Sequence, residues 1–194
     1  MCMILIINNR SHFIYELEKR MTELGAQFIV MDKRDMLNLK RLRKFNGIIL
    51  SGGPLALHRK MYLEDINLDV QVLLDAEVPV LGICLGHQII GDTFGAKTIR
   101  LAQFANKKQD ITILEKDDLF AGFASKKIKV QEAHHDCLNK VPPGFVLLAT
   151  SKKTKVEAMK HISRPLYSVQ FHPEASGAAG KRILKNFLKV CKEI

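Results

Sequence analysis

Cys84 lies where the backbone would present a nucleophilic side chain. It has Gly82 two residues before it and Gly86 two residues after it. The apolar segment 78–83 has the length and β-branched content of a buried strand, and residues 85–94 have a helical pattern. A thiol at such a strand-to-helix corner lies at a helix N-terminus, where backbone N–H groups and the helix dipole favour the thiolate. The Gly-x-Cys-x-Gly pattern therefore predicts a cysteine nucleophile.

A histidine and a glutamate follow a second strand-like segment. His172 comes directly after the apolar run 166–171, and Glu174 is two residues further on. Because Pro173 prevents the chain from continuing as a helix, both side chains can point to one place. A carboxylate so placed can hold the imidazole in one tautomer and stabilise its charged form, as the third member of a catalytic triad does. We therefore predict a triad of Cys84, His172 and Glu174.

Acyl transfer through a thiolate also needs hydrogen-bond donors for an oxyanion. Enzymes whose nucleophile lies at such a strand-to-helix corner, called a nucleophile elbow, take one donor from the N–H of the residue after the nucleophile. Here that residue is Leu85. A second donor is expected from another strand end, and the pair Gly52-Gly53 follows the apolar segment 47–51. We assign the second donor to Gly53, since a glycine presents its amide without a side chain in the way. No Gly-Lys-Ser/Thr follows this pair, which argues against a phosphate-binding loop.

Three segments together resemble the class I (triad) glutamine amidotransferases. They are Ser51-Gly52-Gly53-Pro54, Gly82-Ile83-Cys84-Leu85-Gly86-His87-Gln88 and Gln170-Phe171-His172-Pro173-Glu174, in that order and spacing. The resemblance spans nearly the whole chain. Within the family, it is closest to the separate glutaminase subunits of archaeal-type GMP synthases, because the Gly-Gly-Pro loop and segment 156–161 are similar to theirs. Anthranilate synthase glutaminases tend to have Ser-Pro-Gly-Pro at the loop instead.

The resemblance implies that glutamine is hydrolysed to glutamate and ammonia through a thioester on Cys84. Gln88, one helical turn after the nucleophile, is implied to help bind the substrate, and Gly52 is expected beside it in the pocket. His87 points elsewhere by helical geometry, so we expect it to be structural.

A further segment with the sequence Ala-His-His-Asp resembles the Ser-His-x-Asp stretch that lines the substrate pocket in GMP synthases. It contains His134, His135 and Asp136, with Ala133 in place of the serine. Segment 101–105 departs from the Gly-Glu-aromatic stretch that members often carry there. The adjacent histidines suggest a metal site with His172, but no third ligand at suitable spacing is evident, so we expect no metal.

The resemblance also implies a partner. Ammonia would pass to a separate ATP-pyrophosphatase subunit that uses Mg-ATP to convert xanthosine monophosphate to GMP, and this chain itself would hold no cofactor. Two alternatives share the chemistry or the fold. One is a glutaminase subunit of another synthase, such as anthranilate or aminodeoxychorismate synthase, and the other is a cysteine hydrolase that acts alone.

Strand-like and helical segments alternate in the first half of the chain. Strands are expected over 3–7, 27–31, 47–51 and 78–83, and helices over 11–24, 36–44, 65–76 and 85–94. This alternation predicts an α/β fold with a mostly parallel sheet covered on both faces and ligands at the carboxyl ends of the strands. The second half should add antiparallel strands, over 107–114, 126–131, 145–150, 156–161 and 166–171, before a final helix over 177–191. The resemblance implies a flavodoxin-like three-layer sandwich, and we expect residues 1–194 to form one domain.

Composition limits the classes of function. The 194 residues are 47% hydrophobic and include 30 Lys and Arg against 20 Asp and Glu, a net charge of +10. The basic residues are dispersed and lack interleaved aromatics, so we expect no nucleic-acid partner, although an acidic partner protein would fit. No apolar stretch approaches the ~20 residues of a membrane span, so we expect no membrane association. The four cysteines form no CxxC pair, which fits a reducing cytoplasm.

Overall fold

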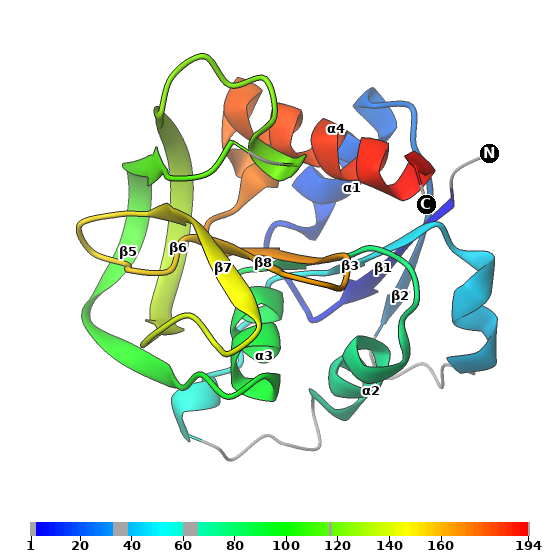
Figure 1. Ribbon diagram of the computed structural model, residues 1–194, viewed down its shortest axis with the longest axis horizontal. Coiled ribbons are helices and arrows are strands. Elements are labelled where there is room, and N and C mark those ends of the chain that lie inside the picture. The colour runs from blue at the N-terminus through cyan, green and yellow to red at the C-terminus, as the bar shows by residue number, and fades with distance from the viewer. Residues whose placement is uncertain (1–2, 33–38, 60–65, 117, 194) are drawn as a thin grey trace.

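The computed structural model describes residues 3–32, 39–59, 66–116 and 118–193, and a nine-stranded mixed sheet runs through them (Figure 1). The strand order is β2-β1-β3-β4-β9-β8-β7-β5-β6. The strands are β1 (Met3–Asn8), β2 (Gln27–Asp32), β3 (Gly47–Leu50), β4 (Val80–Ile83), β5 (Thr98–Ile113), β6 (Lys127–Leu138), β7 (Phe145–Thr150), β8 (Ala158–His161) and β9 (Leu166–Val169). From β2 to β9 in this order neighbouring strands are parallel, and from β9 to β6 they are antiparallel. The predicted parallel sheet with added antiparallel strands is confirmed.

Helices cover both faces of the parallel part of the sheet. Helices α1 (Ile14–Glu23) and α4 (Gly177–Glu193) lie on one face, and α2 (Asn67–Asp75) and α3 (Leu85–Thr93) lie on the other (Figure 1). Alternate side chains of β1 serve the two layers: Ile4 and Ile6 join the core under α1 and α4, whereas Leu5 and Ile7 join the core under α2 and α3. The near-continuous apolar strands therefore arise from burial on both faces.

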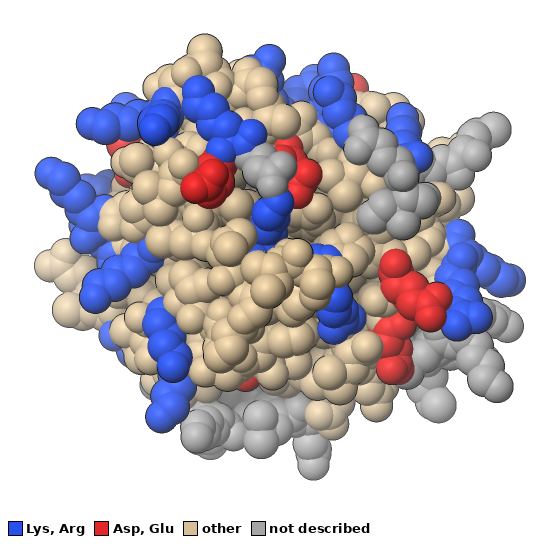
Figure 2. All heavy atoms as spheres, viewed as in Figure 1, with Lys and Arg blue, Asp and Glu red and all other residues tan. Residues whose placement is uncertain are grey.

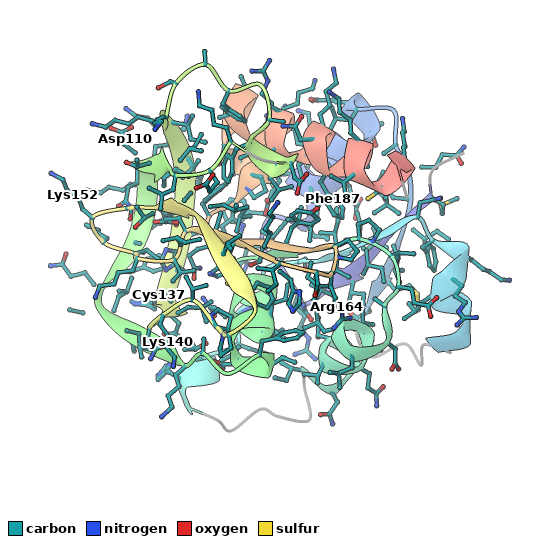
Figure 3. All side chains as sticks on the ribbon, in the orientation of Figure 1. Asp110, Cys137, Lys140, Lys152, Arg164 and Phe187 are labelled. Carbon is teal, nitrogen blue, oxygen red and sulfur yellow. The ribbon has the colours of Figure 1, made fainter. Side chains whose placement is uncertain are left out.

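Two side chains show how the helices are fixed to this sheet (Figure 3). Phe187 points from α4 into the core that lies under α1 and α4, and it is fully buried. The guanidinium of Arg164 donates to the carbonyl of Leu73 at 2.6 Å, which satisfies one of the free carbonyls at the end of α2. None of the described helices combines the length and the apolar character needed to cross a membrane.

The expected elements differ from the observed ones mainly at their ends. Ser11 accepts a hydrogen bond from the N–H of Phe13 at 3.1 Å, so it caps a turn that precedes α1. Residues 36–38 and 65 of two expected helices lie outside the described residues, and Leu39–Lys44 is a 3-10 helix.

The long ribbon of β5 and β6, at the left of Figure 1, is much longer than the expected strands 107–114 and 126–131. More than half of β5 is exposed, and its exposed side chains mix polar residues with apolar ones such as Ile99 and Phe104, so it lacks the regular alternation from which half-buried strands are predicted.

Candidate active site

Cys84 occupies a sharp corner between β4 and α3. Its backbone has φ 50° and ψ −97°, a conformation that is uncommon for a residue with a side chain. A Cβ on Gly82 would lie 2.6 Å from the backbone of Gly86, and a Cβ on Gly86 would lie 2.4 Å from the carbonyl oxygen of Leu50. The two glycines are therefore required by close backbone packing, and they let the corner place the thiol at the N-terminus of α3.

His172 and Glu174 approach Cys84 from the end of β9. His172 Nδ1 lies 2.7 Å from Glu174 Oε1, and both side chains are buried. The backbone N–H of His172 donates to the carbonyl of Gln131 at 2.8 Å, so a neighbouring strand fixes the residue. The ring of Phe13 packs on the imidazole with centroids 4.4 Å apart. With Nδ1 directed at Glu174, the Nε2 side of the ring is left for the cysteine and the substrate.

The charge state of His172 reflects two opposing effects. Burial by itself lowers the pKa of the imidazole, but the charges of Glu174 and Cys84 and the hydrogen bonds with both side chains outweigh it. The pKa of His172 is therefore raised well above its usual value. A protonated imidazole beside a thiol can pair with a thiolate and later supply a proton to a leaving group.

The glycine loop after β3 lies against both reacting side chains. A Cβ on Gly52 would lie 2.9 Å from His172 Cε1 and 3.6 Å from Cys84 Cβ. A Cβ on Gly53 would lie 2.7 Å from a methyl carbon of Leu85. The structure thus brings together the predicted loop, the predicted triad and Leu85, all at the carboxyl ends of parallel strands.

Gln88 belongs to a hydrogen-bonded chain that starts beside the thiol. Its Nε2 donates to the backbone carbonyl of Asp136 at 2.8 Å and to Gln170 Oε1 at 3.3 Å. Gln170 Nε2 in turn lies 3.8 Å from Cys84 Sγ. Sequence reasoning gave no role to Gln170, although it belongs to the motif around His172. Its position directly after a strand whose end carries the triad was the available signal.

The three residues of the Ala-His-His-Asp segment that were predicted to line the pocket face two sides of β6. His134 Nδ1 lies 2.9 Å from the carbonyl of Asp136, and both residues are buried. His135 is exposed on the other side, where it stacks on Phe104 with ring centroids 4.5 Å apart. Asp136 Oδ2 lies 2.7 Å from His58 Nδ1. Only His134 and Asp136 therefore join the network around Gln88.

Behind His134 lies a pair of buried carboxyl groups that the sequence did not suggest. Glu132 Oε2 is 2.8 Å from His134 Nε2, and Glu132 and Glu157 are both fully buried. Burial raises the pKa of Glu132 to about 7 and raises that of Glu157 well above its usual value. Burial also lowers the pKa of His134. Because His134 Nδ1 donates to a carbonyl, Nε2 of the neutral ring is an acceptor, and the Glu132 carboxyl group lies 2.8 Å from it.

His87 agrees with its expected structural role. It is fully buried, its Nδ1 lies 2.8 Å from Ser168 Oγ, and burial lowers its pKa to about 3. Within the described ranges, no group of three or more His, Cys, Asp or Glu side chains is arranged to hold a metal ion.

Comparison with known proteins identifies the family. The family model "Glutamine amidotransferase class-I" matches residues 5–191. A GMP synthase (glutamine-hydrolyzing) subunit of Pyrococcus furiosus is 37% identical over 193 residues, covering 99% of this chain and all of the relative. The subunit of the same name from Methanocaldococcus jannaschii is 35% identical and covers 97% of both chains. A crystal structure of a putative GMP synthase subunit from Thermoplasma acidophilum, 27% identical, superimposes with a TM-score of 0.90 over all of this chain and 95% of that one.

The fold predicted from the sequence is thus shared with a solved relative over nearly its full length. The elbow cysteine, the glycine loop and the histidine–glutamate pair lie within the matched residues. The chain belongs to the class-I glutamine amidotransferase family.

Proposed function

We propose that this chain is the glutamine-hydrolysing subunit of a GMP synthase. The observation that carries the proposal is the strained corner at Cys84, which is backed by the 2.7 Å contact between His172 and Glu174. Relatives that are named as glutamine-hydrolyzing GMP synthase subunits match it over nearly their whole length. The geometry of Cys84, His172 and Glu174 supports thiol-dependent acyl transfer, and the similarity to these relatives supports the choice of synthase.

In the proposed reaction the thiolate of Cys84 attacks the side-chain amide carbon of glutamine. The resulting oxyanion accepts hydrogen bonds from the backbone N–H groups of Gly53 and Leu85. His172 gives its proton to the departing nitrogen, so the C–N bond breaks, ammonia leaves and a glutamyl thioester remains. Water, deprotonated by His172, then cleaves the thioester and releases glutamate, which restores the thiol. Glu174 holds the imidazole and stabilises its charged form throughout.

Substrate binding is assigned to the residues around this centre. Gln170 connects the Cys84 thiol to Gln88, and Gln88 is hydrogen-bonded to the backbone carbonyl of Asp136. We assign Gln88, Gly52, His134 and Asp136 to the pocket for glutamine. His135, which was also predicted to line it, stacks on Phe104 on the other side of β6 and is not part of this assignment.

The ammonia would pass to a separate ATP-pyrophosphatase subunit that binds Mg-ATP and xanthosine monophosphate. We place both subunits in the cytoplasm. The relatives are each named as one subunit of their enzyme, which indicates that a further subunit exists. Direct transfer between subunits is favoured chemically, because ammonia released into water near neutral pH is protonated and is then no nucleophile. In this arrangement the glutaminase chain requires no cofactor of its own.

The test measures glutamate release from glutamine by the chain alone and with a purified ATP-pyrophosphatase subunit, Mg-ATP and xanthosine monophosphate. We expect the partner and its substrates to stimulate glutamate release and GMP to form. Cys84→Ala should abolish both while leaving the melting temperature nearly unchanged.

Cys84-dependent hydrolysis that ignores this partner would overturn the GMP synthase assignment and leave the glutaminase chemistry. Glutamate release that survives in Cys84→Ala would overturn the chemistry itself.

A further inference from the structure

A buried polar cluster that is separate from the triad contacts the glycine loop. Asn9 follows β1, Ser51 follows β3, and Asp69 lies in the first turn of α2. Their exposed fractions are 1%, 1% and 0%. The reaction described above uses none of these side chains, and a buried carboxylate is costly unless its hydrogen bonds are made.

The hydrogen bonds of Asn9 lead to both other members of the cluster. Its Nδ2 donates to Asp69 Oδ1 at 2.9 Å and to the backbone carbonyl of Ser51 at 3.3 Å. Its backbone N–H donates to Ser51 Oγ at 2.9 Å, and the same hydroxyl donates to the carbonyl of Gly52 at 2.9 Å. Asp69 therefore orients an amide whose other contacts lie at the start of the Gly52-Gly53 loop.

The backbone of Asn9 also packs directly against the Gly52-Gly53 loop. A Cβ on Gly53 would lie 2.2 Å from the backbone carbonyl oxygen of Asn9. The loop thus has no space to move toward Asn9, and the hydrogen bonds to Ser51 keep it from moving away. Such fixed placement is what an oxyanion site needs, because its donors stabilise charge only when they are already in position.

We propose that Asp69 is a positioning residue that acts through Asn9 to hold the Gly52-Gly53 loop in place for the reaction at Cys84. The inference rests on the proposed function, since it assigns the oxyanion donor to Gly53. Asp69 touches no substrate in this arrangement. Its effect is on the step in which negative charge develops.

The first test compares Asp69→Ala with Asp69→Asn in the partner-stimulated assay. Asp69→Ala should lower kcat for glutamine about tenfold to a hundredfold and change KM less, because the loss of one oxyanion donor costs about a hundredfold to a thousandfold. Asp69→Asn keeps an oxygen acceptor for Asn9 Nδ2 and should retain most of the activity. Asp75→Ala, at the exposed end of the same helix, is the matched control and should behave as wild type.

A second readout separates positioning from loss of structure. Iodoacetamide alkylation of a thiolate forms no oxyanion, so its rate at Cys84 should be the same in Asp69→Ala and wild type, with Cys84→Ala as the background. The kinetics are normalised to the Cys84 thiol that can be alkylated.

Asn9→Ala provides an independent variant if Asp69→Ala does not fold. It should lower kcat with unchanged alkylation, and the double variant should be no slower than the slower single one, because both changes interrupt one path.

Alkylation and kcat that fall together in these variants would overturn the inference and indicate a structural role. Wild-type kcat in both Asp69→Ala and Asn9→Ala would overturn it too, while leaving the proposed function standing. A wild-type chain without Cys84-dependent glutamate release would overturn the proposed function and this inference together.

Discussion

At the scale of single residues, the contact between His172 and Glu174 is the strongest single effect that keeps the catalytic histidine charged. A buried imidazolium would be unfavourable without a charge partner, and Glu174 is the first of the groups that raise its pKa. The same glutamate is itself buried, so neither charge is screened by water. The pair should therefore depend strongly on its charge and much less on the shape of the carboxyl group.

Glu174→Gln preserves shape and removes the charge, and we expect kcat for glutamate release to fall about a hundredfold to ten-thousandfold. The imidazolium that protonates the departing amide nitrogen is lost as pH rises through the raised pKa of His172. Without Glu174 this pKa falls, so the alkaline limb of the kcat profile should move to lower pH. The measurement is kcat against pH for both proteins.

Glu77→Gln, at an exposed position in an ion pair with Arg43, serves as the control and should leave the profile unchanged. An alkaline limb that stays in place in Glu174→Gln would show that Glu174 does not set the charge state of His172.

At the scale of elements, the parallel strands were the most predictable part of the fold. Segments such as 47–51 and 78–83 are apolar at nearly every position because helices cover both of their faces. Cys84 and His172 could be placed near each other because each follows such a strand, and parallel strands bring their carboxyl ends to one edge. The long ribbon of β5 and β6 could not be delimited, because the exposed side chains of β5 mix polar and apolar residues without a regular alternation.

The supporting residues of the site could not be found from one sequence for a different reason. Asn9 and Asp69 are 60 positions apart, and Glu132 and Glu157 lie on separate segments of the antiparallel half. A single polar residue in a strand, helix or loop has no local feature that tells whether it is solvated or buried. Only the tertiary packing shows that each of these side chains is enclosed.

The buried carboxyl groups of Glu132 and Glu157 make stability depend on pH. The pKa of Glu132 is raised from 4.5 to about 7, so the folded protein keeps a proton that the unfolded chain releases across this window. Folded protein thus binds more protons, and this group's contribution to the free energy of unfolding falls as pH rises from about 4.5 to 7. Glu132→Gln keeps nearly the same shape but has no proton to release, so it removes this fall in stability with pH.

We therefore expect Glu132→Gln to gain stability relative to wild type as pH rises from 5 to 8, by at most about 3 kcal/mol. Urea unfolding at several pH values measures this difference. Glu115→Gln, on the exposed surface, should show no such trend. A difference between Glu132→Gln and wild type that is constant with pH would mean that Glu132 is ionised in the folded protein at pH 5.

At the scale of the whole molecule, the net charge of +10 is spread over the surface. In Figure 2 the Lys and Arg side chains surround the visible face at many separate points, and acidic side chains are fewer. This distribution matches the dispersed basic residues of the sequence. It also places many positive charges on the surface of a small protein. Repulsion among them opposes the compact state and is weakened by salt, since the Debye length falls to ~10 Å at 0.1 M.

The last prediction follows from that repulsion. Lys152 extends into solvent from the loop after β7 (Figure 3), and Lys153 beside it is also exposed. Lys152→Glu/Lys153→Glu lowers the net charge by four, from +10 to +6, and should raise the free energy of unfolding by a few tenths of a kcal/mol at low salt. The gain should shrink as sodium chloride screens the charges, and Lys152→Gln/Lys153→Gln should give about half of it. Urea, which carries no charge, is the suitable denaturant. A gain that persists unchanged in 0.5 M salt would mean that local contacts of these lysines, and not the charge of the whole molecule, are responsible.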